Sequence, residues 1–203
     1  IHRFGKQESA TPFMVLTAAL NMLIYRYSGN EDIFIGTALA NRTRAEVENL
    51  IGFFANTLVL RTDLSKNPDF RELTRRVRTL AIDAYKHQDM PFEVLVAELK
   101  PERDLSRTPL FQILINYQNT PESTLELESL KVSNYETGNK TSKFDLSLQL
   151  SADQGNISGY WEYCTDLFHK PTIERLSEHF QRLLEQGLTH PNNPVSTLPM
   201  LST

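Results

Sequence analysis

The stretch TPFMVLTAALNMLIYRY, Thr11 to Tyr27, is apolar around almost its whole circumference when it is drawn as a helix. Thr11 is a typical N-cap residue, and Pro12 suits the first helical position, where the amide hydrogen that it lacks would have no partner. The residues SGN that follow end the helix. Because a helix without a polar face is normally buried, the sequence predicts that this helix lies inside a packed core.

Strand-forming and helix-forming segments alternate after this helix. Two β-rich runs, 33–38 and 53–61, are separated by a polar loop that is too charged to be core. Residues 67–88 predict an amphipathic helix, and Pro91 restarts a shorter one because a proline disfavours helical geometry in the residue before it. The apolar stripe of the longer helix comprises Phe70, Leu73, Val77, Leu80 and Ala84.

Strands dominate the second half of the chain. The run LFQILINYQ, 110–118, is typical of a strand buried on both faces, and the runs 125–136 and 143–165 indicate a meander. A final helix begins near Pro171, and HPNNP, 190–194, closes the domain. We therefore predict an α/β or α+β fold, in which helices cover a mixed β-sheet with several antiparallel pairs. The apolar face of the final helix comprises Ile173, Leu176, Phe180, Leu183 and Leu184.

Composition excludes several classes of protein. The chain has 203 residues, of which 40% are hydrophobic, enough for a packed core, and its net charge is -4. A mild acidic excess does not make a nucleic-acid surface, and no apolar run approaches a membrane span. The single cysteine, Cys164, excludes an internal disulfide, and with no signal peptide evident it favours a reducing cytoplasm. Because the chain opens on Ile1, we expect it to be part of something longer.

Few residues carry a catalytic or metal-binding signature. The chain has no Gly-rich nucleotide motif, no GxSxG, no HExxH and no CxxC. Its histidines lie far apart without metal-ligand neighbours at helical spacing, so we expect no metal site. We expect His179 to have a surface or packing role beside the apolar face of the final helix, and Cys164 to be an inert small residue. The histidines are His2, His87, His169, His179 and His190.

The stretch HQDMPFEVLV, His87 to Val96, places an imidazole two residues from a carboxylate. Residues two apart on a helix do not face each other, so His87 and Asp89 are poorly placed for a proton relay. A histidine in the last turn suits the negative end of the helix dipole, and Asp89 with Pro91 can cap and restart the next helix. The physics of helix ends therefore favours a structural role for His87.

Three segments together carry a family resemblance. ANRTRAEVENLIGFFANTLVLR (40–61), HQDMPFEVLV (87–96) and RDLSRTPLFQILINYQN (103–119) resemble three successive motifs of the condensation domains of non-ribosomal peptide synthetases. The resemblance continues through KFDLSL, YCTDLF and IERLSEHFQRLLEQ and covers almost the whole chain. It implies a fold like chloramphenicol acetyltransferase, with two lobes in a V, a tunnel between them, and a catalytic HHxxxDG motif on the N-terminal lobe.

This chain contains no adjacent histidines and no HHxxxDG motif. The resemblance therefore implies that residues 1–203 are the C-terminal lobe, that the catalytic histidine belongs to an absent N-terminal lobe, and that the isolated chain is inactive. It also implies a floor loop beneath the tunnel over residues 36–50 and a latch that reaches over the other lobe over residues 120–143. His87 then belongs to a helix–turn–helix and is not the catalytic histidine.

The implied reaction is attack of the amine of an acceptor aminoacyl thioester on a donor acyl or peptidyl thioester, which gives an amide. Both substrates arrive on the 4'-phosphopantetheine arms of carrier domains, and the lobe binds no cofactor directly. Positioning two tethered reactants in a tunnel can supply much of the rate enhancement. The implied partners are the N-terminal lobe, the acceptor and donor peptidyl carrier domains, and an adjacent adenylation domain.

The resemblance also points to two groups of site residues. In the tunnel group, Asn56 and Thr57 can offer polar groups to a substrate or water, and ordinary strand packing is the alternative for each member. The carrier group lies on the long helix, where a solvated face is the alternative for each arginine. The tunnel group is Gly52, Phe54, Asn56 and Thr57. The carrier group is Tyr85, Lys86, Arg75, Arg76 and Arg78.

Two other functions stay open. The lobe of an epimerisation or heterocyclisation relative would share this architecture, although LFQILINYQN looks more like the condensation type. A stand-alone protein that binds carriers or another lobe without catalysis would also fit. The sequence names neither the amino acids that are joined nor the stereochemistry of the donor.

Overall fold

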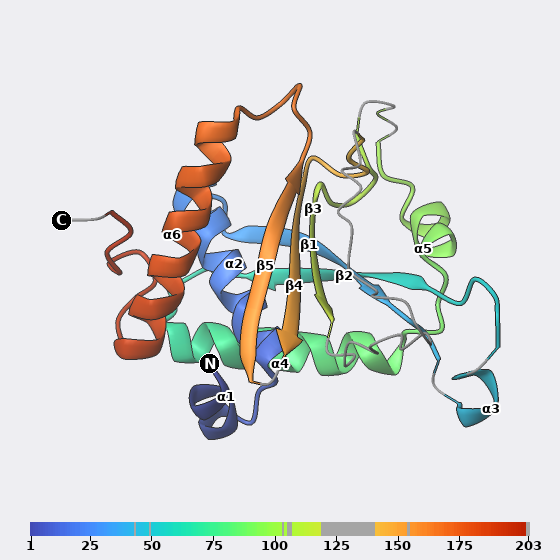
Figure 1. Ribbon diagram of the computed structural model, residues 1–203, viewed down its shortest axis with the longest axis horizontal. Coiled ribbons are helices and arrows are strands. Elements are labelled where there is room, and N and C mark those ends of the chain that lie inside the picture. Colours follow the sequence, from blue (N-terminus) through green and yellow to red (C-terminus); the bar gives the residue numbers. More distant parts are fainter. Residues whose placement is uncertain are drawn as a thin grey trace, which may run out of the picture.

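The computed structural model describes residues 1–42, 44–48, 50–102, 104, 107–118, 141–153 and 155–201. Within these residues the chain forms one sheet with helices packed around it (Figure 1). The helices are α1 (His2–Glu8), α2 (Pro12–Ser28), α3 (Ala45–Glu48), α4 (Phe70–Lys86), α5 (Phe92–Leu99) and α6 (Lys170–Thr189). The strands are β1 (Asp32–Leu39), β2 (Asn56–Asp63), β3 (Ile113–Gln118), β4 (Leu146–Asp153) and β5 (Asn156–Tyr163).

The strands form a mixed sheet in the order β2-β1-β3-β4-β5. The three central strands run parallel, and β2 and β5 flank them as antiparallel edge strands. In the two antiparallel ladders, Ile35 lies opposite Leu60 and Leu148 lies opposite Trp161. The predicted α/β class with a mixed sheet covered by helices is therefore confirmed, and the described strands form two antiparallel pairs.

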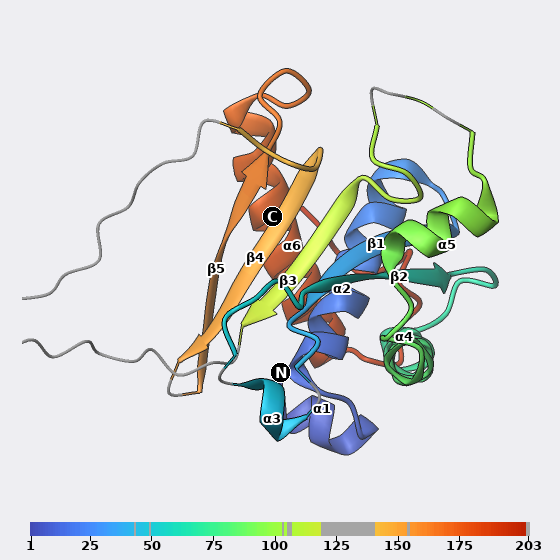
Figure 2. The same cartoon turned by 90° about the vertical axis from the view of Figure 1, so that its right-hand side faces the viewer.

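One face of the sheet is covered by α2, α4 and α6, whereas α5 lies beside the edge strand β2 (Figures 1 and 2). α2 is the innermost helix, because every residue from Phe13 to Leu23 is buried. Thr11 caps it as predicted, since its hydroxyl accepts a hydrogen bond from the Met14 amide at 3.3 Å. α2 is therefore apolar on nearly all sides because the rest of the protein surrounds it.

The two amphipathic helices bury the faces that their sequences predict. α4 buries Phe70, Leu73 and Val77 against the core. Leu80 and Ala84, further along the same stripe, are partly buried against the core. Four of the five apolar residues named for α6 are buried, and Leu184 packs partly against the core.

The opposite face of the sheet is covered in part by aromatic side chains. A Cβ atom on Gly36 of β1 would lie 2.1 Å from the Phe111 ring, so only glycine permits this close approach. The Phe111 ring in turn contacts Phe92 of α5 and Phe144. Further along β3 this face is polar, with Asn116 donating a hydrogen bond to Gln149 at 3.1 Å. The prediction that β3 is buried on both faces therefore holds only for its first half.

Five segments differ from the sequence-based expectations or lie outside the described residues. The floor loop is expected from Gly36, but residues 36–39 complete β1, since they pair with β2. β2 begins at Asn56 rather than at Phe53, and Phe53 is exposed instead. α1 and α3 are not predicted, because neither has an apolar period. Residues 119–140, which include most of the expected latch and the expected strand run 125–136, lie outside the described residues.

Candidate functional site

A cavity of about 470 Å³ opens where β1 and β3 end. Its walls come from α1, the start of α2, the end of β1, the last turn of α4 and β3. Because β1 and β3 are parallel, their carboxyl ends meet at the same edge of the sheet, where open α/β sheets commonly bind ligands. The lining residues are His2, Thr11, Pro12, Phe13, Thr37, Ala38, Leu39, Tyr85 and Tyr117.

The hydrogen-bonding groups of this cavity are mostly neutral hydroxyls. Burial raises the pKa of the Tyr85 phenol, and burial also raises the pKa of Tyr117. Both phenols therefore stay protonated at neutral pH and can donate hydrogen bonds. Thr37 is 2% exposed, and its hydroxyl has no hydrogen-bond partner among the described residues. An uncharged ligand with apolar stretches and hydrogen-bonding groups fits these walls, because the described residues that line them include no Asp, Glu, Lys or Arg.

The loop between β1 and β2 is shaped by Arg42. The guanidinium lies 4.5 Å from the centroid of the Phe54 ring. It also donates hydrogen bonds to the backbone carbonyl oxygens of Val47, Glu48, Leu50 and Gly52. With the loop folded in this way, Ile51 and Phe53 project into solvent, 105% and 95% exposed. The loop thus exposes two large apolar side chains that are two residues apart in the sequence.

The four residues of the predicted tunnel group lie in this loop and at the start of β2. Gly52 is exposed, and Phe54 is half-buried beneath Arg42. Thr57 is half-buried within β2, and the Asn56 side chain bonds to the turn between α4 and α5. The structure thus gathers the group into one region, next to the cavity because Asn56 pairs with the lining residue Leu39. None of the four lines the cavity itself.

Tyr85 and Lys86 of the predicted carrier group occupy the last turn of α4 but face different surroundings. Tyr85 lines the cavity. Lys86 is exposed, and its ammonium donates a hydrogen bond to the Asp83 carboxylate at 2.8 Å. This hydrogen bond is the main reason that the pKa of Asp83 is lowered. A cation and a tyrosine therefore lie next to each other at this end of the helix, one in solvent and one in the cavity.

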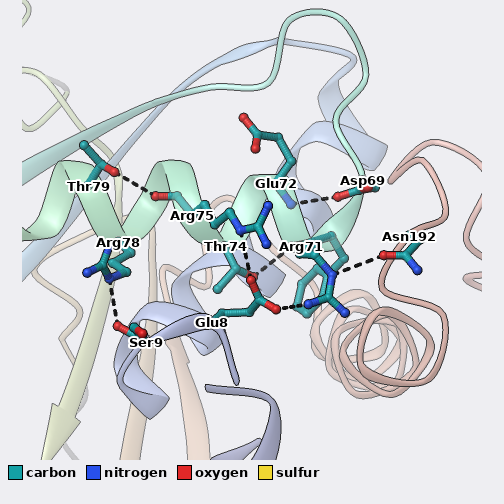
Figure 3. A network of polar contacts seen from close by, with 11 residues as sticks. Glu8, Ser9, Asp69, Arg71, Glu72, Thr74, Arg75, Arg78, Thr79 and Asn192 are labelled. Atoms are coloured by element: carbon teal, nitrogen blue, oxygen red, sulfur yellow. Dashed lines mark hydrogen bonds and ion pairs between the residues drawn. The ribbon is translucent and has the colours of Figure 1, made fainter. Parts of the chain in front are cut away.

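The three arginines of the carrier group all make contacts within the chain. Arg75 lies 2.9 Å from the buried carboxylate of Glu8, as Figure 3 shows. Arg76 pairs with Glu72 at 3.1 Å, and Arg78 donates to the Ser9 carbonyl oxygen at 2.8 Å. These contacts give each arginine a structural role, and carrier binding by them stays a prediction.

Sequence reasoning missed Thr37, Tyr117 and Arg42. Thr37 follows the buried Ile35 by two residues, and Tyr117 follows the buried Ile115 by two. Because strand side chains alternate between faces, this spacing was the signal that places both on the helix-covered face. Arg42 gave no comparable signal, since its partners are backbone groups that only the folded loop brings together.

Helix ends and core packing account for two of the histidines. His87 is the C-cap of α4, as the helix-end interpretation predicts. His179 is buried in α6, with its Nδ1 2.7 Å from the Tyr27 hydroxyl, which confirms a packing role. In the described part of the chain, no three or more His, Cys, Asp or Glu side chains group to hold a metal ion. No helix there has the length and hydrophobicity that crossing a bilayer requires.

Curated relatives match the chain over its whole length. It is 48% identical to a linear gramicidin synthase protein of Brevibacillus parabrevis and spans 4% of that protein. It is 40% identical to surfactin synthase subunit 1 of Bacillus subtilis (strain 168) and spans 6% of it. The chain therefore corresponds to a small part of each of these relatives.

Solved structures resemble the chain as one part of a larger unit. The X-domain from teicoplanin biosynthesis, 32% identical, superposes with a TM-score of 0.87 over 97% of this chain and 46% of that chain. The first condensation domain of the CDA synthetase, 16% identical, gives a TM-score of 0.77 over 99% of this chain and 45% of that chain. The mixed sheet and its helices are thus the chloramphenicol-acetyltransferase-like fold of condensation domains. A family model described as the condensation domain matches residues 1–203, and the chain belongs to that family.

Proposed function

We propose that residues 1–203 form the C-terminal lobe of a non-ribosomal peptide synthetase condensation domain. The main support comes from two observations. The condensation-domain model matches the whole chain, yet the chain covers only 45% of a solved condensation domain. In the proposed reaction the amine of an acceptor aminoacyl thioester attacks the carbonyl carbon of a donor acyl or peptidyl thioester. An amide forms, and the donor thiol leaves.

In this proposal the lobe positions substrates and does not supply the group that transfers protons. No two of its histidines are adjacent in sequence, and His87 and His179 serve a helix end and the core. The catalytic histidine then belongs to the N-terminal lobe, and the isolated chain forms no amide. Holding two tethered reactants in register can still supply much of the rate enhancement.

The cavity at the ends of β1 and β3 would form part of the tunnel wall. Its neutral hydroxyls and apolar walls suit a pantetheine arm, an uncharged chain that carries amide groups. Gly52, Phe54 and Thr57 would lie on the tunnel side, together with Asn56. The 4'-phosphopantetheine stays on the carrier domains, so that the lobe holds no cofactor of its own.

The end of α4 would receive the acceptor carrier. The exposed ammonium of Lys86 complements the acidic surface that carrier domains usually present around their modified serine. Arg75, Arg76 and Arg78 add positive charge on the same helix, although internal contacts hold their guanidinium groups. A donor carrier, an adenylation domain and a cytoplasmic location complete the proposal.

The experiment that tests this function uses a complete two-lobe domain with the double substitution Tyr85→Ala and Lys86→Glu. We expect acceptor-carrier binding to weaken by about 1–3 kcal/mol, because aromatic contact area is lost and like charges meet at a small interface. Donor-carrier binding should hold. Amide formation from loaded carriers should occur with the complete domain and not with residues 1–203 alone.

Lys170→Glu on α6 is the matched control, because Lys170 is equally a lysine in an exposed helical ion pair. It should leave both affinities unchanged, and circular dichroism should report the same fold for every variant. If the double variant binds both carriers as the parent does, the acceptor carrier docks elsewhere. Turnover by the isolated chain would refute the assignment of chemistry to the other lobe.

A second candidate, a non-catalytic binding module, has one observation in its favour. The X-domain from teicoplanin biosynthesis, which superposes closely on this chain, has been solved in a complex with OxyB. As a non-catalytic module, the domain that contains this chain would bind a protein partner without forming an amide. A complete domain that binds loaded carriers but gives no amide would favour this candidate.

A further inference from the structure

The side-chain amide of Asn56 uses its whole hydrogen-bonding capacity within the chain. Its Nδ2 donates to the carbonyl oxygens of Gln88 and Met90, at 2.7 and 2.8 Å. Its Oδ1 accepts from the backbone amides of Phe92 and Thr57, at 3.2 and 2.9 Å. A carboxamide has two N–H donors and two oxygen lone pairs, so no capacity is left for a substrate.

α5 depends on this asparagine because it has no cap of its own. Its N-cap residue is Pro91, which makes no side-chain hydrogen bond. The first backbone N–H groups of a helix have no partner inside the helix. Asn56 Oδ1 accepts the N–H of Phe92, so a residue of β2 performs the task that Ser or Asp performs at an ordinary N-cap.

The turn that Asn56 holds joins two helices that contact the candidate site. α4 carries Tyr85, a wall of the cavity, in its last turn. α5 begins with Phe92, whose ring lies 5.7 Å from that of Phe111, and Phe111 packs on Gly36 of β1. Movement of the turn would therefore displace a cavity wall on one side and the packing over β1 on the other.

We propose that Asn56 is a positioning residue that fixes the corner between α4 and α5, and thereby Tyr85, without touching substrate. This inference rests on the proposed function, in which Tyr85 marks the acceptor side. It gives a physical link between two stretches of the sequence, 51–61 and 87–96, because the asparagine of the first binds the turn of the second.

The test is Asn56→Asp in the complete condensation domain. Aspartate keeps the shape of asparagine, but when ionised it has no donor and turns negative charge toward two carbonyl oxygens. We expect hydrogen exchange over residues 88–95 to accelerate about tenfold or more relative to the parent. The KM for the loaded acceptor carrier should rise about fivefold, while kcat changes by less than about twofold, since substrate contacts are intact.

Asn116→Asp is the matched control, because Asn116 is a strand asparagine whose side chain makes a single hydrogen bond, to Gln149. It should leave exchange over 88–95 within about twofold of the parent. If Asn56→Asp fails to fold by circular dichroism, Asn56→Ala removes the same bonds without adding charge and carries the same test.

Unchanged exchange over 88–95, faster exchange with an unchanged KM, or a fall in kcat alone would each overturn the inference. The exchange measurement does not depend on the proposed function. A domain that forms no amide at all refutes the function, whereas exchange still reports whether Asn56 holds the turn.

Discussion

The junction of α1 with α4 and the loop between β1 and β2 both depend on arginine, but they leave the surface in opposite states. At the junction the Glu8 carboxylate is buried, and Arg71 and Arg75 close over it (Figure 3). In the loop Arg42 binds backbone carbonyls and an aromatic ring, while large apolar side chains face solvent. The charged groups at the junction are paired within the chain, whereas the apolar side chains of the loop form a surface that no described residue covers.

The difference separates a region whose charged groups are paired within the chain from a region whose large apolar side chains no described residue covers. Burying apolar side chains drives folding, so a loop with Ile51 and Phe53 in water gains nothing from them in the isolated chain. Exposed apolar side chains on a shaped loop gain their stabilisation when another surface covers them. In the proposed function that surface is the companion lobe.

Breaking the junction should give the largest effect. Glu8→Ala leaves two guanidinium groups without their common counter-charge, and we expect the free energy of unfolding to fall by about 2–3 kcal/mol. Arg71 and Arg75 remain partly exposed, which keeps the loss below that of a fully buried pair. Urea unfolding measures it. Glu72→Ala, which removes a half-exposed partner of Arg76, should cost about 0.5 kcal/mol, and equal losses would mean that the junction is ordinary surface.

Substituting the residue that shapes the loop should have a smaller, local effect. Arg42→Lys removes the planar fork, and a lysine cannot reach four carbonyl oxygens and stack on Phe54 together. We expect exchange over 50–54 to accelerate about tenfold, with less than about 1 kcal/mol of global destabilisation. Arg61→Lys, at an exposed ion pair with Asp32, is the control and should change neither quantity. An unaltered loop in the Arg42 variant would show that the backbone alone sets its shape.

Removing the exposed apolar side chains should have the smallest effect on the isolated chain. Ile51→Ser with Phe53→Ser should change its free energy of unfolding by about 0.5 kcal/mol or less, because neither side chain is buried. The same pair of changes in a complete domain should cost about 2 kcal/mol or more, as burial of large apolar side chains would then be lost. Thermal unfolding of both forms gives the comparison. Equal losses in the two forms would mean that the loop meets no companion surface.

The core helices were predictable because periodicity reports burial. Residues 11–27 lack a polar face, and α2 is enclosed; residues 67–88 repeat apolar side chains at helical spacing, and α4 buries them. α1 was not predictable, because HRFGKQE has no apolar period and is held by tertiary contacts such as Glu8 with the α4 arginines. Local pattern therefore finds elements that pack by a face and misses those held by particular partners.

The candidate site was less predictable than the fold. The resemblance assigned Tyr85 to the carrier group, and the structure places it in the wall of a cavity. The other walls of that cavity include Thr37 and Tyr117, which only the parallel pairing of β1 with β3 brings together. Asn56 was chosen as a polar group for substrate, but its amide is engaged with backbone groups of residues 88–92. Such assignments depend on long-range contacts that no local spacing encodes.

Hydrogen exchange of the isolated chain against the complete condensation domain tests most directly whether the loop, and not the junction, meets a companion lobe. We predict that amides of residues 50–54 gain about tenfold or more protection in the complete domain, while those of residues 70–78 in α4 stay within about twofold. Equal exchange of 50–54 in both forms, or a gain confined to α4, would contradict the assignment of this loop as the contact surface.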